Sequence, residues 1–134
     1  MIFTERYNMK TIDISGTWFC RTNDSDTWRG GFTLPGSACG NGVGAKQEYY
    51  DELTKDAVRA PRERYEYIAP LYLRREIEIP ADWRDKNISL FLERVNMASS
   101  AWLDGKQIGH KTVGLSTPHI YDLTGTEPGK HILE

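Results

Sequence analysis

The stretch LYLRREIEIP, residues 71–80, alternates between apolar and polar side chains with a single exception. The apolar positions are Leu71, Leu73, Ile77 and Ile79, and the polar positions are Tyr72, Arg74, Glu76 and Glu78. Since successive side chains of a strand point to opposite faces, this pattern predicts a strand with one buried face. Pro80 ends the predicted strand, because proline has no N–H for the sheet ladder.

Arg75 is the exception, because it places a charge on the apolar face of that strand. A charge at such a position usually needs a partner, since burying an unpaired charge is costly. Glu93 lies beside Arg94 in the next apolar stretch, NISLFLERV (residues 87–95). We therefore expect Arg75 and Glu93 to form a partly buried pair that sets the register of two strands.

The stretch NISLFLERV is itself predicted to be a strand, with apolar side chains on both of its faces. Ile88, Leu90 and Leu92 fall on one face, and Phe91 and Val95 fall on the other. A strand that is apolar on both faces is typical of the middle of a sheet, so we expect a central strand here.

A hairpin is predicted for AWLDGKQIGH, residues 101–110. Asp104 and Gly105 separate two short segments of strand character. The Asp-Gly pair is the strongest short-range hairpin signal, because both central residues of a type I′ turn need a positive φ.

Shorter strand candidates flank these segments on both sides. They are residues 11–22, 30–34, 119–123 and the stretch after the Pro128-Gly129 turn. Residues 39–44 are expected to form an irregular loop, and PADWRDK (80–86) a turn or a single helical turn. Residues 46–58 have helical composition and predict at most a short helical turn, with a long irregular excursion as the alternative.

Regularly spaced short strands with turn residues between them predict an all-β sandwich or barrel. The length of 134 residues fits one domain, which we place at residues 1–134. A strand is expected to begin at HILE, where the chain stops, which predicts that this domain is a fragment of a longer polypeptide.

Charge and hydropathy exclude two classes of partner. Lys plus Arg total 17 and Asp plus Glu total 19, for a net charge of -2, so no basic excess is present to bind nucleic acid. No apolar run reaches the roughly 20 residues that cross a bilayer, so no membrane partner is expected. Glu5, Arg6 and Lys10 occupy the place of a signal peptide's apolar core, which leaves the compartment open.

No catalytic or metal-binding motif is found. His110, His119 and His131 lie in no recognisable motif with Ser or Cys and lack metal-ligand spacing, so we expect no metal and no cofactor. The polar run at residues 23–26 lacks the glycine and the distal glutamate of a calcium loop. Cys20 and Cys39 are expected to be free thiols, with one disulfide as the alternative.

The aromatic residues divide into two groups. Trp18, Trp83 and Trp102 lie in or beside predicted strands, so we expect them to fill the core. Trp28 and the pair Tyr49-Tyr50 lie in segments of loop character, where they could either pack or stack against a sugar.

The ordered set of these motifs resembles the N-terminal domain of β-galactosidase and β-glucuronidase-type glycoside hydrolases. The resemblance covers the chain from about Ile14 to its end and is strongest over the second half. The matching segments are 33–37, 73–75, 93–95, 102–105, 108–110, 117–118, 121–123 and 128–133. The loop KTVGLS has one glycine where the family often has two, so the identity of the sugar does not follow.

This resemblance implies a jelly-roll β-sandwich of the galactose-binding-domain-like kind, a sugar-binding domain. It implies a parent enzyme of carbohydrate metabolism, a retaining β-glycosidase with an immunoglobulin-like domain and a (β/α)8 barrel. The catalytic glutamates of the family lie in that barrel, so no residue here is assigned as catalytic and this chain alone is expected to be inactive.

The resemblance also implies two substrate-binding candidates, Asp104 and His110. In galactosidase relatives the polar residue before the hairpin glycine reaches toward the sugar pocket of the barrel, and Asp104 occupies that place. A carboxylate suits this task because it accepts hydrogen bonds from hydroxyl groups. The alternative function is a free-standing carbohydrate-binding module or lectin-like domain, which would need an exposed aromatic groove.

Overall fold

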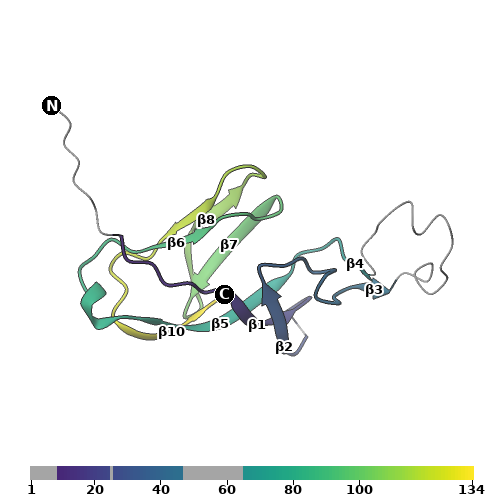
Figure 1. Cartoon of the computed structure of the whole chain (residues 1–134), viewed down its shortest axis with the longest axis horizontal. Helices are drawn as coiled ribbons and strands as arrows, with labels where there is room; N and C mark the ends of the chain where they lie inside the picture. Colours follow the sequence, from purple (N-terminus) through teal and green to yellow (C-terminus); the bar gives the residue numbers. More distant parts are fainter. Residues whose placement is uncertain (1–8, 25, 47–64) are drawn as a thin grey trace.

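The structure, a computed structural model, describes residues 9–24, 26–46 and 65–134. These residues form ten strands and one short 3-10 helix (Figure 1). The elements are β1 (Gly16–Arg21), β2 (Arg29–Leu34), β3 (Ala45–Lys46), β4 (Tyr65–Glu66), β5 (Tyr72–Ile79), η2 (Ala81–Trp83), β6 (Ser89–Leu92), β7 (Ala98–Leu103), β8 (Lys106–Val113), β9 (His119–Asp122) and β10 (Gly129–Leu133).

All of the strand pairs are antiparallel, and they form a β-sandwich, which confirms the predicted all-β fold. The largest sheet has the order β2-β1-β5-β10-β7-β8, and β6-β9 and β3-β4 are separate pairs. Figure 1 shows β1, β2, β5 and β10 in one layer, with β6, β7 and β8 above them. The large sheet continues from one layer to the other at β10, which pairs along its length with β5 and through Leu133 with Leu103 of β7.

The strand predicted for residues 71–80 is β5, a central strand of the large sheet. It pairs with β1 on one side and with β10 on the other. Pro80 ends it and precedes η2, which confirms the turn predicted for that segment. The alternation of residues 71–80 therefore predicts the strand that lies between β1 and β10 in the first layer.

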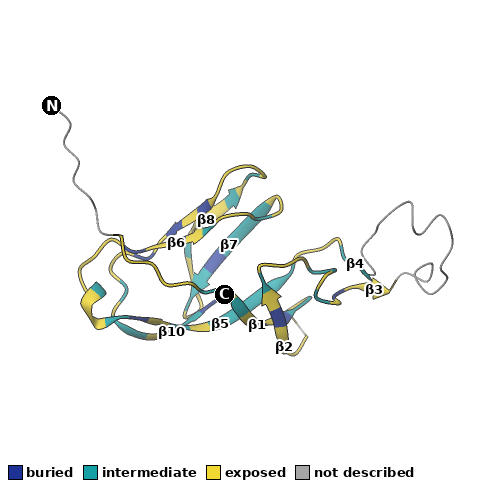
Figure 2. Ribbon diagram, viewed as in Figure 1, coloured by how far each residue is buried: buried dark blue, intermediate teal, exposed yellow. Residues whose placement is uncertain are grey.

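The core lies between the two layers and draws on most of the strands (Figure 2). Its buried members are Trp18, Cys20, Phe32, Val43, Ile79, Ile88, Leu90, Ala101, Tyr121, Leu123 and Leu133. Leu133 has no exposed surface, so the last strand of the chain is packed into the centre of the sandwich.

The tryptophans follow the pleat of the strands. Trp18 is buried and Trp83 packs against the core, as predicted. Trp102 is half-buried and lies outside the core cluster, which corrects the prediction for this residue. Because alternate residues of β7 face the core, Ala101 and Leu103 point inward and Trp102 points to the opposite face.

The predicted pair of Arg75 and Glu93 is wrong. The Arg75 guanidinium donates from Nη1 to the carbonyl oxygens of Ile14 (2.8 Å) and Ser15 (2.7 Å). The Glu93 side chain is 76% exposed and lies 3.9 Å from Arg94. The two backbone carbonyls just before β1 are therefore the partners of the Arg75 charge.

The prediction of a central strand at residues 87–95 is also wrong. Within the described residues, β6 has one sheet neighbour, β9. Phe91 is 56% exposed and stands opposite Ile120, which is 58% exposed. The second apolar face of this strand is therefore on the surface.

Two further expectations concern the cysteines and the segment after β3. Cys20 and Cys39 are free thiols. The helical turn proposed for residues 46–58 lies, apart from Lys46 in β3, outside the described residues, as do Tyr49 and Tyr50.

Candidate functional site

The β7–β8 hairpin carries both of the substrate-binding candidates. Leu103 pairs with Lys106 across the two-residue turn. The φ angles of Asp104 and Gly105 are 50° and 78°, so both central residues are left-handed, as a type I′ turn requires. The predicted turn is confirmed.

The Asp104 carboxylate is fixed to strand β10. Its Oδ1 accepts the backbone N–H of Ile132 at 2.8 Å, and its Oδ2 lies 2.6 Å from Nδ1 of His131. The backbone N–H of Asp104 donates to the carbonyl of Ile132, also at 2.8 Å. The tip of the hairpin is therefore clasped to β10 by three hydrogen bonds, and the carboxylate belongs to that clasp.

His131 is positioned to carry a proton on both of its ring nitrogens. Its Nδ1 faces the Asp104 carboxylate, and its Nε2 donates to the carbonyl of Glu127 at 2.7 Å. Since both neighbours are acceptors, the geometry favours the imidazolium form. The hydrogen bond with Asp104 raises the pKa of His131, and the same bond, followed by that from Ile132, lowers the pKa of Asp104.

His110 lies in an irregular part of β8, away from the turn. Ala101 pairs with Ile108 and Ser99 with Thr112, so three residues of β8 stand opposite one residue of β7. Gly109 has a φ of 59°, and this bulge leaves His110 exposed. Four strand steps separate His110 from the turn at Lys106, about 13 Å, so the structure does not bring His110 and Asp104 together.

A buried polar network lies toward the other end of the hairpin, and sequence reasoning missed it. The hydroxyl of Ser99 lies 2.7 Å from both Nδ1 of His119 and the hydroxyl of Tyr121. Nε2 of His119 lies 3.1 Å from the carbonyl of Gly114. Because that carbonyl can only accept, Nε2 carries the proton, Ser99 donates to Nδ1, and Tyr121 donates to Ser99.

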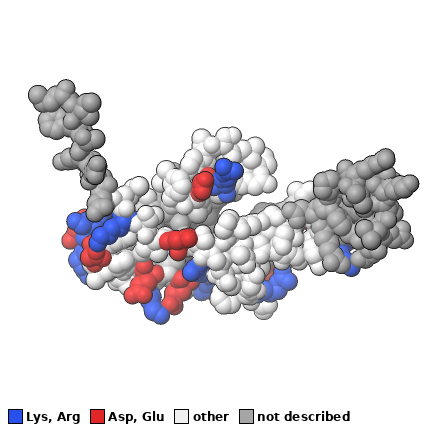
Figure 3. All heavy atoms as spheres, in the orientation of Figure 1, with Lys and Arg blue, Asp and Glu red and all other residues white. Residues whose placement is uncertain are grey.

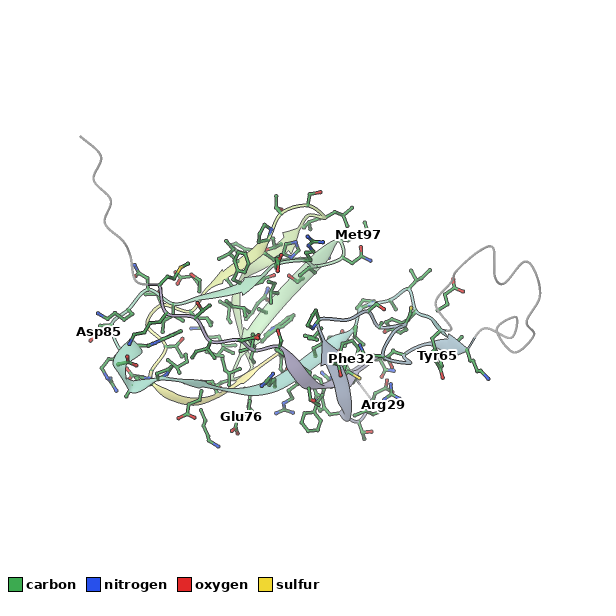
Figure 4. All side chains as sticks on the ribbon, in the orientation of Figure 1. Arg29, Phe32, Tyr65, Glu76, Asp85 and Met97 are labelled. Atoms are coloured by element: carbon green, nitrogen blue, oxygen red, sulfur yellow. The ribbon has the colours of Figure 1, made fainter. Side chains whose placement is uncertain are left out.

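This network holds the loop of residues 114–118 against the sandwich. The N–H of Gly114 also donates to the carbonyl of Met97 at 2.7 Å. Figure 4 shows Met97 at the end of the upper layer. The spacing of His119 and Tyr121 by two residues could have indicated a shared inward face, but nothing local in the sequence points to Ser99.

The network of Ser99, His119 and Tyr121 stabilises the fold and does not form a reactive site. His119 has no exposed surface and Tyr121 is 2% exposed, so a substrate cannot reach the Ser99 hydroxyl through them. Both histidine nitrogens are also engaged. Within the part of the chain that the structure describes, no three side chains of His, Cys, Asp or Glu are placed to hold a metal ion.

Trp28 is not a free stacking platform. The guanidinium of Arg21 lies 4.6 Å from its ring centroid and that of Arg74 lies 5.4 Å from it. At least one face of this half-buried ring is therefore taken by cation–π contacts and is not open to a sugar ring.

Charged side chains of both signs lie on the described surface. Figure 3 shows Lys and Arg side chains interspersed with Asp and Glu on the face in view. Among the described residues, no helix is long and apolar enough to span a bilayer.

The sequence matches no protein-family model, and no curated protein matches it. Solved structures do match. The β-D-glucuronidase of Dictyoglomus thermophilum superposes with a TM-score of 0.62 at 20% identity, over 90% of this chain and 18% of that chain. A β-glucuronidase of an uncultured Clostridium sp. gives a TM-score of 0.64 at 18% identity, over 99% of this chain and 23% of that chain.

A GH2 β-galacturonidase from Eisenbergiella tayi, bound to galacturonate, gives a TM-score of 0.60 at 24% identity. The match covers 92% of this chain and 18% of that one. The chain thus spans about a fifth of the length of the solved structures that it matches. At these identities the likeness establishes the fold, which is that of one domain within these glycosidases.

Proposed function

We propose that this chain is the N-terminal accessory domain of a retaining β-glycosidase of the β-galactosidase or β-glucuronidase type. The observation that carries the proposal is the superposition of 90–99% of the chain on about a fifth of β-glucuronidase structures. The ordered motifs of residues 73–133 support the same family independently of the superposition. The domain is of the jelly-roll, galactose-binding-domain-like kind.

In this proposal the chemistry belongs to another part of the parent enzyme. The partners are an immunoglobulin-like domain, a (β/α)8 barrel that supplies both catalytic glutamates, and the carbohydrate substrate. The domain packs against the barrel and lends it a rigid surface. The clasp of Asp104 on β10 and the network that holds residues 114–118 are the features that support such rigidity.

A kinetic comparison tests this proposal. The chain alone should not hydrolyse 4-nitrophenyl β-D-glucuronide, β-D-galacturonide or β-D-galactoside, whereas the native polypeptide that contains it should hydrolyse one of them. Turnover by the isolated chain above the buffer rate would contradict the assignment, because a catalytic centre would then lie within these residues.

Direct contact of Asp104 or His110 with the saccharide stays a prediction. In the full-length enzyme, Asp104→Ala should raise KM or lower kcat while the protein remains folded. His131→Gln is the matched control, because it removes the side-chain hydrogen bond of the clasp and leaves the carboxylate in place. Equal kinetic effects of the two substitutions would reduce Asp104 to a residue that positions the hairpin.

The alternative, a free-standing carbohydrate-binding module or lectin-like domain, has less support. Such a module needs an exposed aromatic platform, and the Trp28 ring is covered by two guanidinium groups. Calorimetry of the chain against neutral β-galactosides would favour this alternative if it showed strong binding.

A further inference from the structure

A cleft of about 510 Å³ lies beside the β1–β2 edge of the large sheet. This volume falls within the range of about 300–1,000 Å³ that is usual for small-molecule sites. Residues from the β1–β2 connection, from the loop before β3 and from the segment after β4 form its walls. Its lining residues are Arg21, Thr22, Asp26, Thr27, Arg29, Gly42, Val43, Gly44 and Tyr67.

Arg21 is held in place on one wall of this cleft. Its guanidinium lies 4.6 Å from the ring centroid of Trp28 and 5.1 Å from that of Tyr72. It also donates to the carbonyl oxygen and the carboxylate of Asp24, at 3.0 and 3.1 Å. A guanidinium fixed by two rings and an acceptor loses little entropy when it meets a further anion.

The hydrogen bonding of Arg21 is incomplete. Among the described residues, its Nε is the buried side-chain polar atom that has no hydrogen-bond partner. Unsatisfied buried donors are uncommon in folded proteins, and because this atom has almost no exposed surface, a ligand in the cleft reaches it only if the Arg21 side chain shifts.

Arg29 supplies a second positive charge to the cleft. It is exposed on β2 and has no ion pair within the described residues (Figure 4). Asp26 supplies one negative charge, since the hydrogen bond from the Thr22 hydroxyl lowers the pKa of this carboxyl. Arg21 is ion-paired with Asp24, so the positive charge that the cleft offers without a described partner is that of Arg29, and a single such charge suits a singly charged anion better than a dianion.

The remaining polar groups suit a polyol. Thr22 and Thr27 bring hydroxyl groups, and the Asp26 carboxylate can accept hydrogen bonds from sugar hydroxyls. Tyr67 forms part of the wall, and its hydroxyl donates to the carbonyl of Pro70 at 2.6 Å. We propose that this cleft, lined by Arg21, Arg29, Thr22, Thr27 and Asp26, is a binding site for a carboxylate-bearing saccharide such as a uronate.

This site is separate from the hairpin that carries Asp104 and His110. Its carboxylate specificity follows chiefly from Arg29, and its saccharide specificity rests in part on the proposed function. A uronate seated here would keep an acidic polysaccharide chain on the domain while the parent enzyme acts on another of its residues.

A titration followed by the backbone amide signals of the chain tests the proposal. The probes are methyl β-D-glucuronide, the neutral methyl β-D-glucoside, and glucose 6-phosphate as a dianion. We expect saturable shifts at residues 22–29 and 42–44 with the glucuronide, and weaker binding of the other two. Arg29→Gln should weaken glucuronide binding at least about tenfold, the loss expected for one charge-assisted hydrogen bond.

Lys111→Gln is the matched control, because it removes one positive charge from an exposed position of β8. It should leave the affinity unchanged. Equal affinity for the glucoside, an equal effect of both substitutions, tighter binding of the phosphate, or no saturable shift in the cleft would each overturn the proposal. Such a failure would not affect the proposal that the chain is a domain of a β-glycosidase. Conversely, a native protein without a catalytic domain would overturn the proposed function but not the proposed saccharide site in the cleft.

Discussion

Replacement of Ser99 by alanine tests whether the buried network between β7 and β9 stabilises the sandwich. The substitution removes one hydroxyl that serves two buried partners, Nδ1 of His119 and the hydroxyl of Tyr121. Alanine fits the same space, so the cost comes from two unsatisfied groups and not from a cavity. With about 1–3 kcal/mol for each orphaned group and some relaxation, we expect a loss of about 2–4 kcal/mol.

Tyr121→Phe separates the two contributions. It deletes one hydroxyl and leaves Ser99 free to donate to His119, so the expected loss is about 0.5–1.5 kcal/mol. In the double variant no tyrosine hydroxyl is left without a partner. The combined loss should therefore be smaller than the sum of the single losses, by about 1 kcal/mol.

Equilibrium unfolding in urea measures these differences. At an unchanged slope of about 2 kcal/mol per molar urea, the Ser99→Ala midpoint should fall by about 1–2 M. Ser116→Ala is the control, since Ser116 is exposed and its loss should change stability by less than about 0.5 kcal/mol. A Ser99→Ala midpoint equal to that of the control, or strict additivity in the double variant, would refute the assigned network.

Three further predictions follow from the described contacts. The raised pKa of His131 means that its stabilisation is complete below its ordinary pKa of 6.5 and is lost as the pH rises through the folded value. The lowered pKa of Asp104 means that its contribution to stability is present above pH 3.8 and is lost as the pH falls through its lower folded pKa. The Tm difference between the unchanged chain and the His131→Gln variant should therefore be largest near pH 5–6 and should shrink in alkali. Leu133→Ala should cost about 2–5 kcal/mol in urea unfolding, because this side chain has no exposed surface. Arg75→Gln should lower the Tm, because it removes charged hydrogen bonds to two backbone carbonyls, whereas Glu93→Gln should leave the Tm unchanged. Equal losses of Tm in the two variants would instead indicate that Arg75 and Glu93 form an ion pair.

The features that the sequence predicts correctly are those set by neighbouring residues. The alternation of residues 71–80 depends on the pleat of one strand, and β5 follows it. The turn at Asp104-Gly105 depends on two φ angles, and both residues adopt them. An all-β sandwich then follows from the number and spacing of such segments.

The features that the sequence misses depend on contacts between distant segments. Arg75 finds its acceptors about 60 positions earlier, in backbone carbonyls that have no signature in the sequence. Ser99 meets His119 from a different strand pair, so no local motif joins them. The orientation of the Asp104 carboxylate depends on how the hairpin docks on β10, which the turn type does not determine.

The mass of the native polypeptide that contains this chain tests the proposal that the chain is a non-catalytic domain of a β-glycosidase. An antibody raised against residues 65–134 can isolate that polypeptide for mass spectrometry and for assay with 4-nitrophenyl β-glycosides. We expect a polypeptide several times larger than 15.3 kDa that hydrolyses such a substrate, since the chain spans about a fifth of the structures it matches. A native protein of 15.3 kDa, or a larger one without glycosidase activity, would contradict it.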